Sequence, residues 1–248
     1  MTGNRVVWLS QDDPPASFPP VSEALIEPDG LLAAGGDLGE QRLLYAYRNG
    51  IFPWYEEGQP ILWWSPDPRC IFLPGDIHIA RRLRREFRRT TIELRFNTAF
   101  GEVIRACAGP RRSQQGTWIT AEMLAAYENL HRAGWAHSIE VWDSGELCGG
   151  LYGLAIGKAF FGESMFSHRA NASKIALAWF SQQLQAGIFE LLDCQVESAH
   201  LTGLGARVIP RQAFVGHLDA ACGDGLAFDE WPDNPLPCSE LIGDPRDD

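Results

Sequence analysis

Three consecutive stretches in the second half of the chain carry the pattern of an antiparallel sheet. They read HSIEVWD, ELCGGLYGLAIG and KAFFGESMF, with Ser144-Gly145 and Gly157-Lys158 at the two junctions. Short junctions that contain glycine are typical of tight turns between antiparallel neighbours. The sequence therefore predicts a three-stranded meander over residues 137–166, and the other elements of this half have to fit around it.

The segments after the meander alternate between helix and strand. NASKIALAWFSQQLQAG places Ile175, Trp179 and Phe180 on one helical face and ends at Gly187. Four further segments follow: a strand over 189–196 (FELLDCQV), the segment SAHLTGLGA, a strand over 207–210 (RVIP) and a last helix over 211–221. Three strands, a helix, a strand, a helix and a strand in this order are typical of an α/β sandwich of the acyltransferase type.

The first half of the chain mixes helices with strands that rigid turns interrupt. Asp37 suits a helix N-cap, Leu43 and Leu44 have helical spacing, and Gly50 ends that helix. The segment after it is rich in proline and aromatic residues, which favours short strands. Further elements are expected: a helix over 77–89, a strand over 91–96, and helices over 99–108 and 121–133. The predicted fold class is α+β, with a small N-terminal α+β domain over 1–70, the sandwich over 71–222 and an acidic tail over 223–248.

Composition and charge narrow the class of protein. The 248 residues are 45% hydrophobic and 21% charged, as in an ordinary globular protein. No secretory signal or membrane-length apolar run is visible, and the six cysteines contain no C-x-x-C pair, so we expect reduced thiols, a cytoplasmic location and no metal site. Residues 223–248 hold eight acids and one arginine, or −7 of the net charge of −11. This tail is expected to be extended and solvated.

The stretch IARRLRREFRR predicts an amphipathic helix with one positive face. At about 100° per residue, six arginines fall within an arc of about 160°, opposite Leu83 and Phe87. These arginines are Arg81, Arg82, Arg84, Arg85, Arg88 and Arg89. A solvated face normally mixes charges of both signs, so a binding site for a phosphate backbone is favoured over a plain solvated face. The nine tryptophans leave two interpretations open, core packing or stacking on an unpaired base.

Three polar residues stand in apolar strand sequences. Asp193 and Gln195 share one face if LLDCQVE is a strand, and Glu163 lies among phenylalanines in FFGESMF. Alternation turns Cys194 away from Asp193, so Cys194 is an unattractive candidate for a nucleophile. A buried acid needs a partner, so each acid is either structural, Glu163 pairing with Lys174 or an arginine, or part of a site. Two acids in one small sheet favour a site.

Eight motifs in order resemble a known family. EPDGLLAAGGDL, AYRNGIFPW, WWSPDPR, GTWIT, HSIEVW, GESMFS, NASK and DCQ resemble the bacterial leucyl/phenylalanyl-tRNA–protein transferases, from about Pro19 to Ala221. The resemblance implies transfer of Leu or Phe (Met less well) from the acceptor end of Leu-tRNA or Phe-tRNA to proteins with N-terminal Arg or Lys, which marks them for N-end rule degradation. It implies a small N-terminal domain before a domain similar to acyl-CoA N-acyltransferases. We expect no cofactor, no metal and no membrane association. We expect the protein to be a monomer.

The resemblance also assigns residues. Trp54 and Trp118 would hold the 3′-terminal adenosine. An apolar pocket for the transferred side chain would be lined by Leu151, Phe160, Phe161, Ser164, Leu177, Phe180, Leu184 and Leu192. Glu163, Asp193 and Gln195 match the polar active-site residues. We expect Asp193 to polarise Gln195, whose carbonyl oxygen accepts a hydrogen bond from the attacking amine, while Glu163 orients the amine or the ribose. The alternatives are an acetyl-CoA-dependent N-acetyltransferase and a non-enzymatic RNA-binding module.

Overall fold

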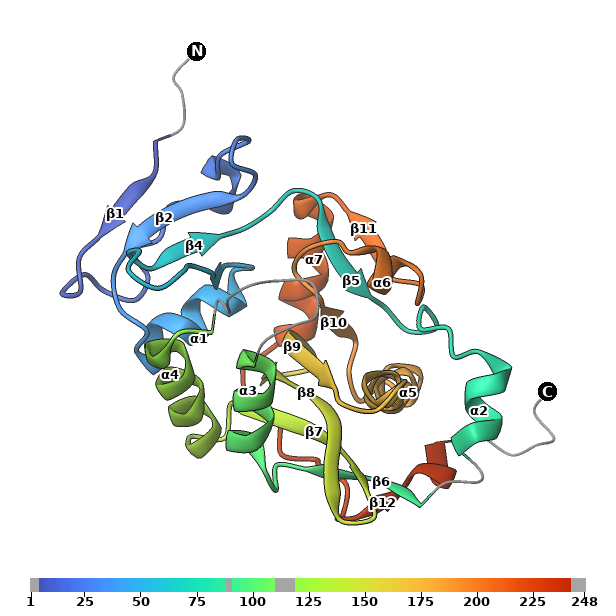
Figure 1. Cartoon of the computed structure of the whole chain (residues 1–248). Coiled ribbons are helices and arrows are strands. Elements are labelled where there is room, and N and C mark those ends of the chain that lie inside the picture. Colours follow the sequence, from blue (N-terminus) through green and yellow to red (C-terminus); the bar gives the residue numbers. More distant parts are fainter. Residues whose placement is uncertain (1–4, 88–90, 110–118, 242–248) are drawn as a thin grey trace.

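The computed structural model describes residues 5–87, 91–109 and 119–241 (Figure 1). The helices are α1 (Glu40–Arg48), α2 (Arg81–Phe87), α3 (Phe100–Ala108), α4 (Ala121–Arg132), α5 (Ala172–Gln185), α6 (Ala199–Thr202), α7 (Arg211–Cys222) and the 3-10 turns η1 (Val21–Glu23) and η2 (Cys238–Leu241). The strands are β1 (Val7–Leu9), β2 (Leu31–Gly35), β3 (Phe52–Pro53), β4 (Leu62–Trp64), β5 (Arg69–Phe72), β6 (Ile92–Phe96), β7 (Ala136–Asp143), β8 (Glu146–Ile156), β9 (Ala159–Ser167), β10 (Leu191–Asp193), β11 (Arg207–Ile209) and β12 (Leu236–Pro237). Within these ranges no helix is long and apolar enough to cross a membrane.

A small N-terminal sheet, in the order β1-β2-β4-β3, precedes the larger part of the chain. Helix α1 follows β2 and packs against α4 and α7 of the larger part. The predicted N-cap is wrong by two residues, because Gly39 takes that position. Asp37 instead accepts hydrogen bonds from the Gly39 backbone at 2.7 Å and from Arg42 Nε at 2.8 Å. The helix ends before Gly50, as expected from its φ of 72°.

The larger sheet has the order β11-β5-β10-β9-β8-β7-β6-β12. The predicted meander is confirmed, since β7, β8 and β9 pair antiparallel. Ser144 and Gly145 have φ of 54° and 84°, the left-handed pair that a type I′ hairpin turn requires. Strand β10 lies parallel to β9 and antiparallel to β5. The predicted α+β class, with a small N-terminal part followed by an α/β sandwich, is confirmed. The predicted boundary at residue 70 falls inside β5, and that division of domains stays a prediction.

Apolar side chains alternate between the two faces of the larger sheet. In β8, Tyr152 and Leu154 join the hydrophobic cluster under α1, α3, α4 and α7, whereas Leu151 and Ala155 join the cluster under α5. Figure 1 shows the same two layers, with α3 and α4 on one side of the central strands and α5 on the other. Both faces of the sheet are therefore covered, as the sandwich prediction requires.

The predicted strand over 189–196 is wrong at both ends, because β10 covers only Leu191–Asp193. Gln195 has a φ of 63°, in the left-handed region that a strand cannot include. Its backbone N–H donates to the Asp193 side chain at 2.9 Å, a local bond that replaces the sheet pairing. Asp193 and Gln195 therefore do not share a strand face.

The arginine-rich helix starts later than predicted. Helix α2 begins at Arg81, four residues after the expected start, and residues 88–90 lie outside the described ranges. Leu83 is buried in the cluster under α5, whereas Arg81, Arg82 and Arg84 are exposed. The described part of the helix is therefore amphipathic in the predicted sense.

The start of the acidic tail is packed rather than extended, which corrects the sequence-based expectation for residues up to 241. Trp231 stacks on Trp179 of α5, with ring centroids 5.7 Å apart, and lies against His137 at 4.5 Å. The Asn234 side chain bonds both the N–H and the C=O of Phe96, at 2.7 and 3.2 Å. Aromatic and amide side chains thus attach the tail to α5 and β6. The many charged residues of the tail led to the expectation of an extended, solvated segment.

Trp231→Ala is expected to lower the free energy of unfolding by about 2–3 kcal/mol, because it removes a partly buried aromatic ring from a cluster of rings. Urea denaturation measures the change. Leu226→Ala, in the same tail but 69% exposed, is the matched control and should change stability by less than about 0.5 kcal/mol. Equal effects of the two substitutions would contradict the packed tail.

Candidate active site

Glu163 occupies a bulge in β9. The pairing of β8 with β9 runs from Tyr152 opposite Ser164 to Gly153 opposite Gly162, so Glu163 is the extra residue between them. A bulge of this kind turns a side chain away from simple alternation and is common beside active sites. Glu163 is only 8% exposed. The bulge therefore aims a nearly buried carboxyl group at a point where the sheet, α1 and α4 meet.

Three side chains from three parts of the chain hold the Glu163 carboxyl group. The hydroxyls of Tyr47 on α1 and Tyr127 on α4 donate to its two oxygens at 2.6 and 3.0 Å, and the two hydroxyls also contact each other. The Gln195 amide Nε2 donates to the first oxygen at 2.6 Å. In the described ranges no lysine or arginine pairs with Glu163, and Lys174 bonds Asn171 instead. The structural pairing considered from sequence is therefore replaced by a neutral hydrogen-bonded network.

The pKa of Glu163 in this network lies close to neutral pH. Burial raises its pKa from 4.5 to about 7, against the hydrogen bonds from Tyr47, Tyr127 and Gln195, which lower it. Burial also raises the pKa of both tyrosines well above 10.0, so they remain protonated donors. A carboxyl group with a pKa of about 7 can both accept and release a proton under physiological conditions, as a general acid–base group must.

Asp193 is fully buried and paired with Arg69. The Arg69 guanidinium donates from Nε and Nη2 to the two Asp193 oxygens, at 2.8 and 2.7 Å. The Gln195 backbone N–H also donates to this carboxylate, at 2.9 Å. The predicted contact between Asp193 and the Gln195 side-chain amide is therefore wrong, because the end of β10 turns that amide toward Glu163. Asp193 acts on the backbone of Gln195 instead.

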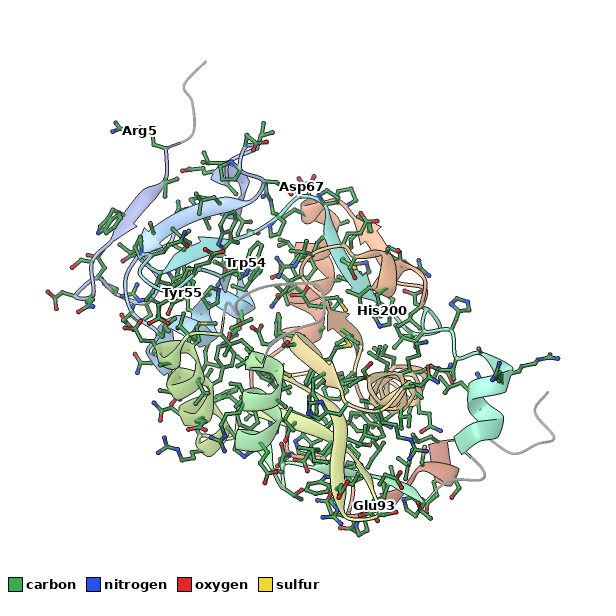
Figure 2. The ribbon with its side chains drawn as sticks, in the orientation of Figure 1. Arg5, Trp54, Tyr55, Asp67, Glu93 and His200 are labelled. Carbon is green, nitrogen blue, oxygen red and sulfur yellow. The ribbon has the colours of Figure 1, made fainter. Side chains whose placement is uncertain are left out.

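An open pocket of about 590 Å³ lies beside Glu163. Of the predicted residues, Leu151, Ser164, Leu177 and Leu192 line it. Sequence reasoning missed Gly162, Met165, Cys194, Ser198, His200 and Leu201, which also line it. Figure 2 labels His200, on the α6 side of the site. Burial raises the pKa of the Cys194 thiol well above 9.0, so this thiol is not primed as a nucleophile.

The other four predicted pocket residues do not line the pocket. Phe160, Phe180 and Leu184 belong to the buried cluster under α5, where the two phenylalanine rings are 4.6 Å apart. Phe161 points to the opposite face of the sheet, 5.2 Å from the Tyr47 ring. Phe160 and Phe161 are adjacent in β9, so alternation prevents both from facing one cavity.

The tryptophans divide into core and surface. Trp63 is fully buried, whereas Trp54 is 45% exposed, 5.7 Å from the Trp64 ring (Figure 2). The Tyr55 hydroxyl beside it contacts Thr120, at the start of α4, at 3.3 Å. Trp118, the second predicted adenosine residue, lies outside the described residues.

A second groove, of about 470 Å³, is basic. His78, Arg82 and Lys174 line it, with Asn171 and the backbone near Gly203. It shares α5 and the α6 region with the pocket beside Glu163. Arg81 and Arg84 are exposed on the same helix as Arg82, while the Arg85 side chain, Arg88 and Arg89 lie outside the described part of the chain. In the described ranges no group of three His, Cys, Asp or Glu side chains gathers as metal ligands would.

An α/β sandwich with a buried acid of near-neutral pKa beside an open, largely apolar pocket fits a group-transferring enzyme such as an acyltransferase. Family sequence profiles match at two places: leucyl/phenylalanyl-tRNA protein transferase over residues 71–219, and the N-terminal domain of the same family over residues 36–67. The chain belongs to the leucyl/phenylalanyl-tRNA–protein transferase family and is an aminoacyltransferase. The resemblance inferred from the motifs is confirmed.

Relatives match over most of their length. A leucyl/phenylalanyl-tRNA–protein transferase of Alkalilimnicola ehrlichii is 56% identical over 218 residues, covering 88% of this chain and 84% of the relative. That of Stutzerimonas stutzeri is 54% identical, covering 86% of this chain and 96% of the relative. Among solved structures, a GCN5-related N-acetyltransferase from Kribbella flavida aligns with a TM-score of 0.37 at 12% identity, over 66% of this chain and 58% of that one.

Proposed function

We propose that this enzyme transfers Leu or Phe, and Met less well, from aminoacyl-tRNA to the α-amine of proteins with N-terminal Arg or Lys. The product carries a new peptide bond and is marked for N-end rule degradation in the cytoplasm. The names of the relatives support the substrates, and the carrying observation in this chain is Glu163, a buried acid with a pKa of about 7 at the wall of an open pocket. We expect a monomer to be active, because the residues of the network come from one chain.

The chemistry needs one proton acceptor and no external energy source. The amine nitrogen bonds to the ester carbonyl carbon, the bond from that carbon to the ribose oxygen breaks, and one amine proton ends on the ribose oxygen. Because a free α-amine has a pKa of about 7.7–8, a base with a pKa of about 7 is well matched to it. Glu163 takes this proton and can return it to the leaving oxygen.

Gln195 positions the amine beside Glu163. Its Nε2 donates to the Glu163 carboxyl group, and among the described residues its other amide atom, Oε1, has no hydrogen-bond partner. That oxygen accepts a hydrogen bond from the attacking amine, as expected from sequence. Asp193 supports this arrangement by holding the Gln195 backbone rather than by polarising the amide.

The pocket is suited to an apolar side chain such as that of Leu or Phe. Leu151, Leu177, Leu192 and Met165 provide its apolar surface, and Phe160 and Phe180 lie buried in the same core cluster. Burying a Leu or Phe side chain there contributes about 1.5–3 kcal/mol of binding free energy, which a polar or charged side chain cannot gain. The pocket therefore selects the amino acid, and the acid beside it performs the reaction.

The tRNA would bind across two surfaces. The exposed Trp54 stacks on the terminal adenine, with Trp118 as its predicted partner, and the basic groove of Arg82 and Lys174 with the exposed Arg81 and Arg84 contacts the phosphates. These phosphate contacts predict a strong salt dependence of tRNA binding.

Trp54→Ala is expected to raise the KM for aminoacyl-tRNA about 5- to 150-fold, because base stacking contributes about 1–3 kcal/mol. The kcat should stay within a factor of about 3, since the reacting groups are untouched. Trp8→Ala is the matched control, because Trp8 is even more exposed, at 69%, but lies in β1. Equal KM values for the two variants would remove Trp54 from the binding site.

Incubation of the enzyme with radiolabelled Leu-tRNA and a peptide with N-terminal Arg tests the proposed function. We expect label in the peptide, less label with an N-terminal Asp peptide, and none when the α-amine is acetylated. Tight binding of tRNA without any transfer would favour a binding module. Binding of acetyl-CoA measured by calorimetry, together with acetylation of the same peptide, would favour the N-acetyltransferase.

A further inference from the structure

We propose that Arg69 is a positioning residue for the transfer reaction: it fixes the Asp193 carboxylate, which holds the Gln195 backbone in the conformation that brings the Gln195 amide to Glu163. Arg69 touches neither substrate and acts through two other residues. The inference rests on the proposed function, since it assigns to Gln195 a role in the chemistry.

Burial, two aromatic rings and several hydrogen bonds fix the position of the Arg69 guanidinium. It is 1% exposed, and its plane lies between the rings of Phe52 and Phe214, 4.8 and 4.6 Å from the ring centroids. Nη1 donates to the Gly50 carbonyl at 3.2 Å, and the fork of Nε and Nη2 holds both oxygens of Asp193. Gly50 and Phe52 follow α1, Phe214 belongs to α7 and Asp193 ends β10. One side chain thus ties three separate parts of the fold together.

The next link is the strained backbone of Gln195. A residue other than glycine at a φ of 63° costs about 1 kcal/mol or more relative to an ordinary conformation, so neighbouring contacts must hold it there. Two contacts do so. The Gln195 N–H donates to Asp193 at 2.9 Å, and the Gln195 carbonyl accepts from the Cys70 N–H at 3.2 Å. Cys70 is the residue after Arg69, so both contacts depend on the same end of β5.

The last link is the Gln195 side chain. Its Nε2 reaches Glu163 at 2.6 Å, and this hydrogen bond lowers the pKa of Glu163 against the effect of burial. If the backbone of Gln195 relaxes, the hydrogen bond is lost and the pKa of Glu163 rises. A change at Arg69 should therefore be visible in the protonation of a carboxyl group that Arg69 does not touch.

Only arginine fits this position. Two parallel N–H groups, a third donor toward Gly50 and a flat cation between two rings are the geometry of a guanidinium. A lysine keeps the charge but offers a single ammonium group, which cannot hold both Asp193 oxygens in one plane. Arg69→Lys therefore removes the orientation of Asp193 while leaving the ion pair possible.

The test compares Arg69→Lys with Arg42→Lys. Arg42 is a matched control because it is 2% exposed and paired with Asp37, but its contacts lie in the N-terminal part, away from Glu163. We expect Arg69→Lys to lower kcat about 10- to 100-fold, because misplacing a reacting group by about 1 Å costs up to 10²-fold. The KM for aminoacyl-tRNA should stay within about 2-fold, and the acidic limb of the pH–rate profile should move to higher pH. Arg42→Lys should change none of the three, and equal changes in both variants would overturn the proposal.

Gln195→Ala separates a positioning role from a general loss of structure. If Arg69 acts through Gln195, then Arg69→Lys should cost less than about 3-fold in kcat in a Gln195→Ala background. The full cost in that background would overturn the proposal, while wild-type kcat/KM in Gln195→Ala alone would instead overturn the proposed function of Gln195. Should Arg69→Lys fail to fold, Arg69→Met with Asp193→Leu replaces the whole ion pair by apolar side chains. This folded double variant should keep the low kcat, and a wild-type kcat would contradict the positioning role.

Discussion

Glu163→Gln is expected to lower kcat/KM by about 10²–10⁴-fold, the contribution typical of a general base. Glutamine has the same shape and can still accept hydrogen bonds from Tyr47 and Gln195, but it cannot take up the amine proton. Steady-state kinetics with Leu-tRNA and an N-terminal Arg peptide measures the loss. A kcat/KM within about 3-fold of wild type would show that another group accepts the proton.

Glu140→Gln is the matched control for this substitution. Glu140 is also buried and bonded to Ser138, Trp142 and the Ala99 backbone, but it does not line the pocket. We expect its kcat to stay near wild type even where the variant is less stable. A similar loss of activity in both variants would mean that any buried glutamate matters and that Glu163 has no special role.

The stability of Glu163→Gln should change with pH in a defined direction. The pKa of Glu163 is raised from 4.5 to about 7 in the folded enzyme, so the fold favours the protonated form. The stabilisation from this protonation is complete below pH 4.5 and is lost as the pH rises through about 7. The glutamine of the variant does not titrate, so the variant should gain stability relative to wild type between about pH 5 and about pH 8, which thermal melts at both pH values can measure. An unchanged difference would contradict the raised pKa.

Asp193→Ala is expected to lower the free energy of unfolding by about 3–5 kcal/mol, because it leaves the Arg69 guanidinium buried without its counter-ion. Urea denaturation measures the loss, and activity should fall with it because the Gln195 backbone is released. Asp37→Ala also removes the partner of a buried arginine, Arg42, but Asp37 is 37% exposed, so the loss should be clearly smaller. A loss below about 1 kcal/mol for Asp193→Ala would mean that water reaches Arg69.

Regular patterns made much of the fold predictable. The meander has a clear apolar alternation and glycine-containing turns, and it extends only one residue beyond each predicted end. Long helices such as α5 follow the 3.6-residue period. By contrast, β10 ends after Asp193 because the Asp193 side chain takes the backbone N–H of Gln195, and no apolar pattern reports such a bond. The bulge at Glu163 is equally invisible, since one extra residue leaves the local composition unchanged.

Three polar residues of the candidate site were predictable from the sequence, but their partners and half of the predicted pocket lining were not. Glu163, Asp193 and Gln195 stand out as polar groups in apolar sequence, and the motifs AYRNG and WWSPDPR contain Tyr47 and Arg69. Their partners lie more than a hundred residues away, Tyr47 on Glu163 and Arg69 on Asp193, so only the fold joins them. The phenylalanines assigned to the pocket show the same limit, because alternation and burial direct them into the core.

The most direct test of the account is the rate of a single transfer as a function of pH, measured from about pH 5.5 to about pH 9 with enzyme in excess over labelled Leu-tRNA. The wild-type rate should rise through about pH 7 as Glu163 loses its proton, and again near the acceptor's amine pKa of about 7.7–8. Glu163→Gln should be slow at every pH and should keep only the second rise. A first rise that survives in Glu163→Gln would contradict the assignment of Glu163 as the group that accepts the amine proton.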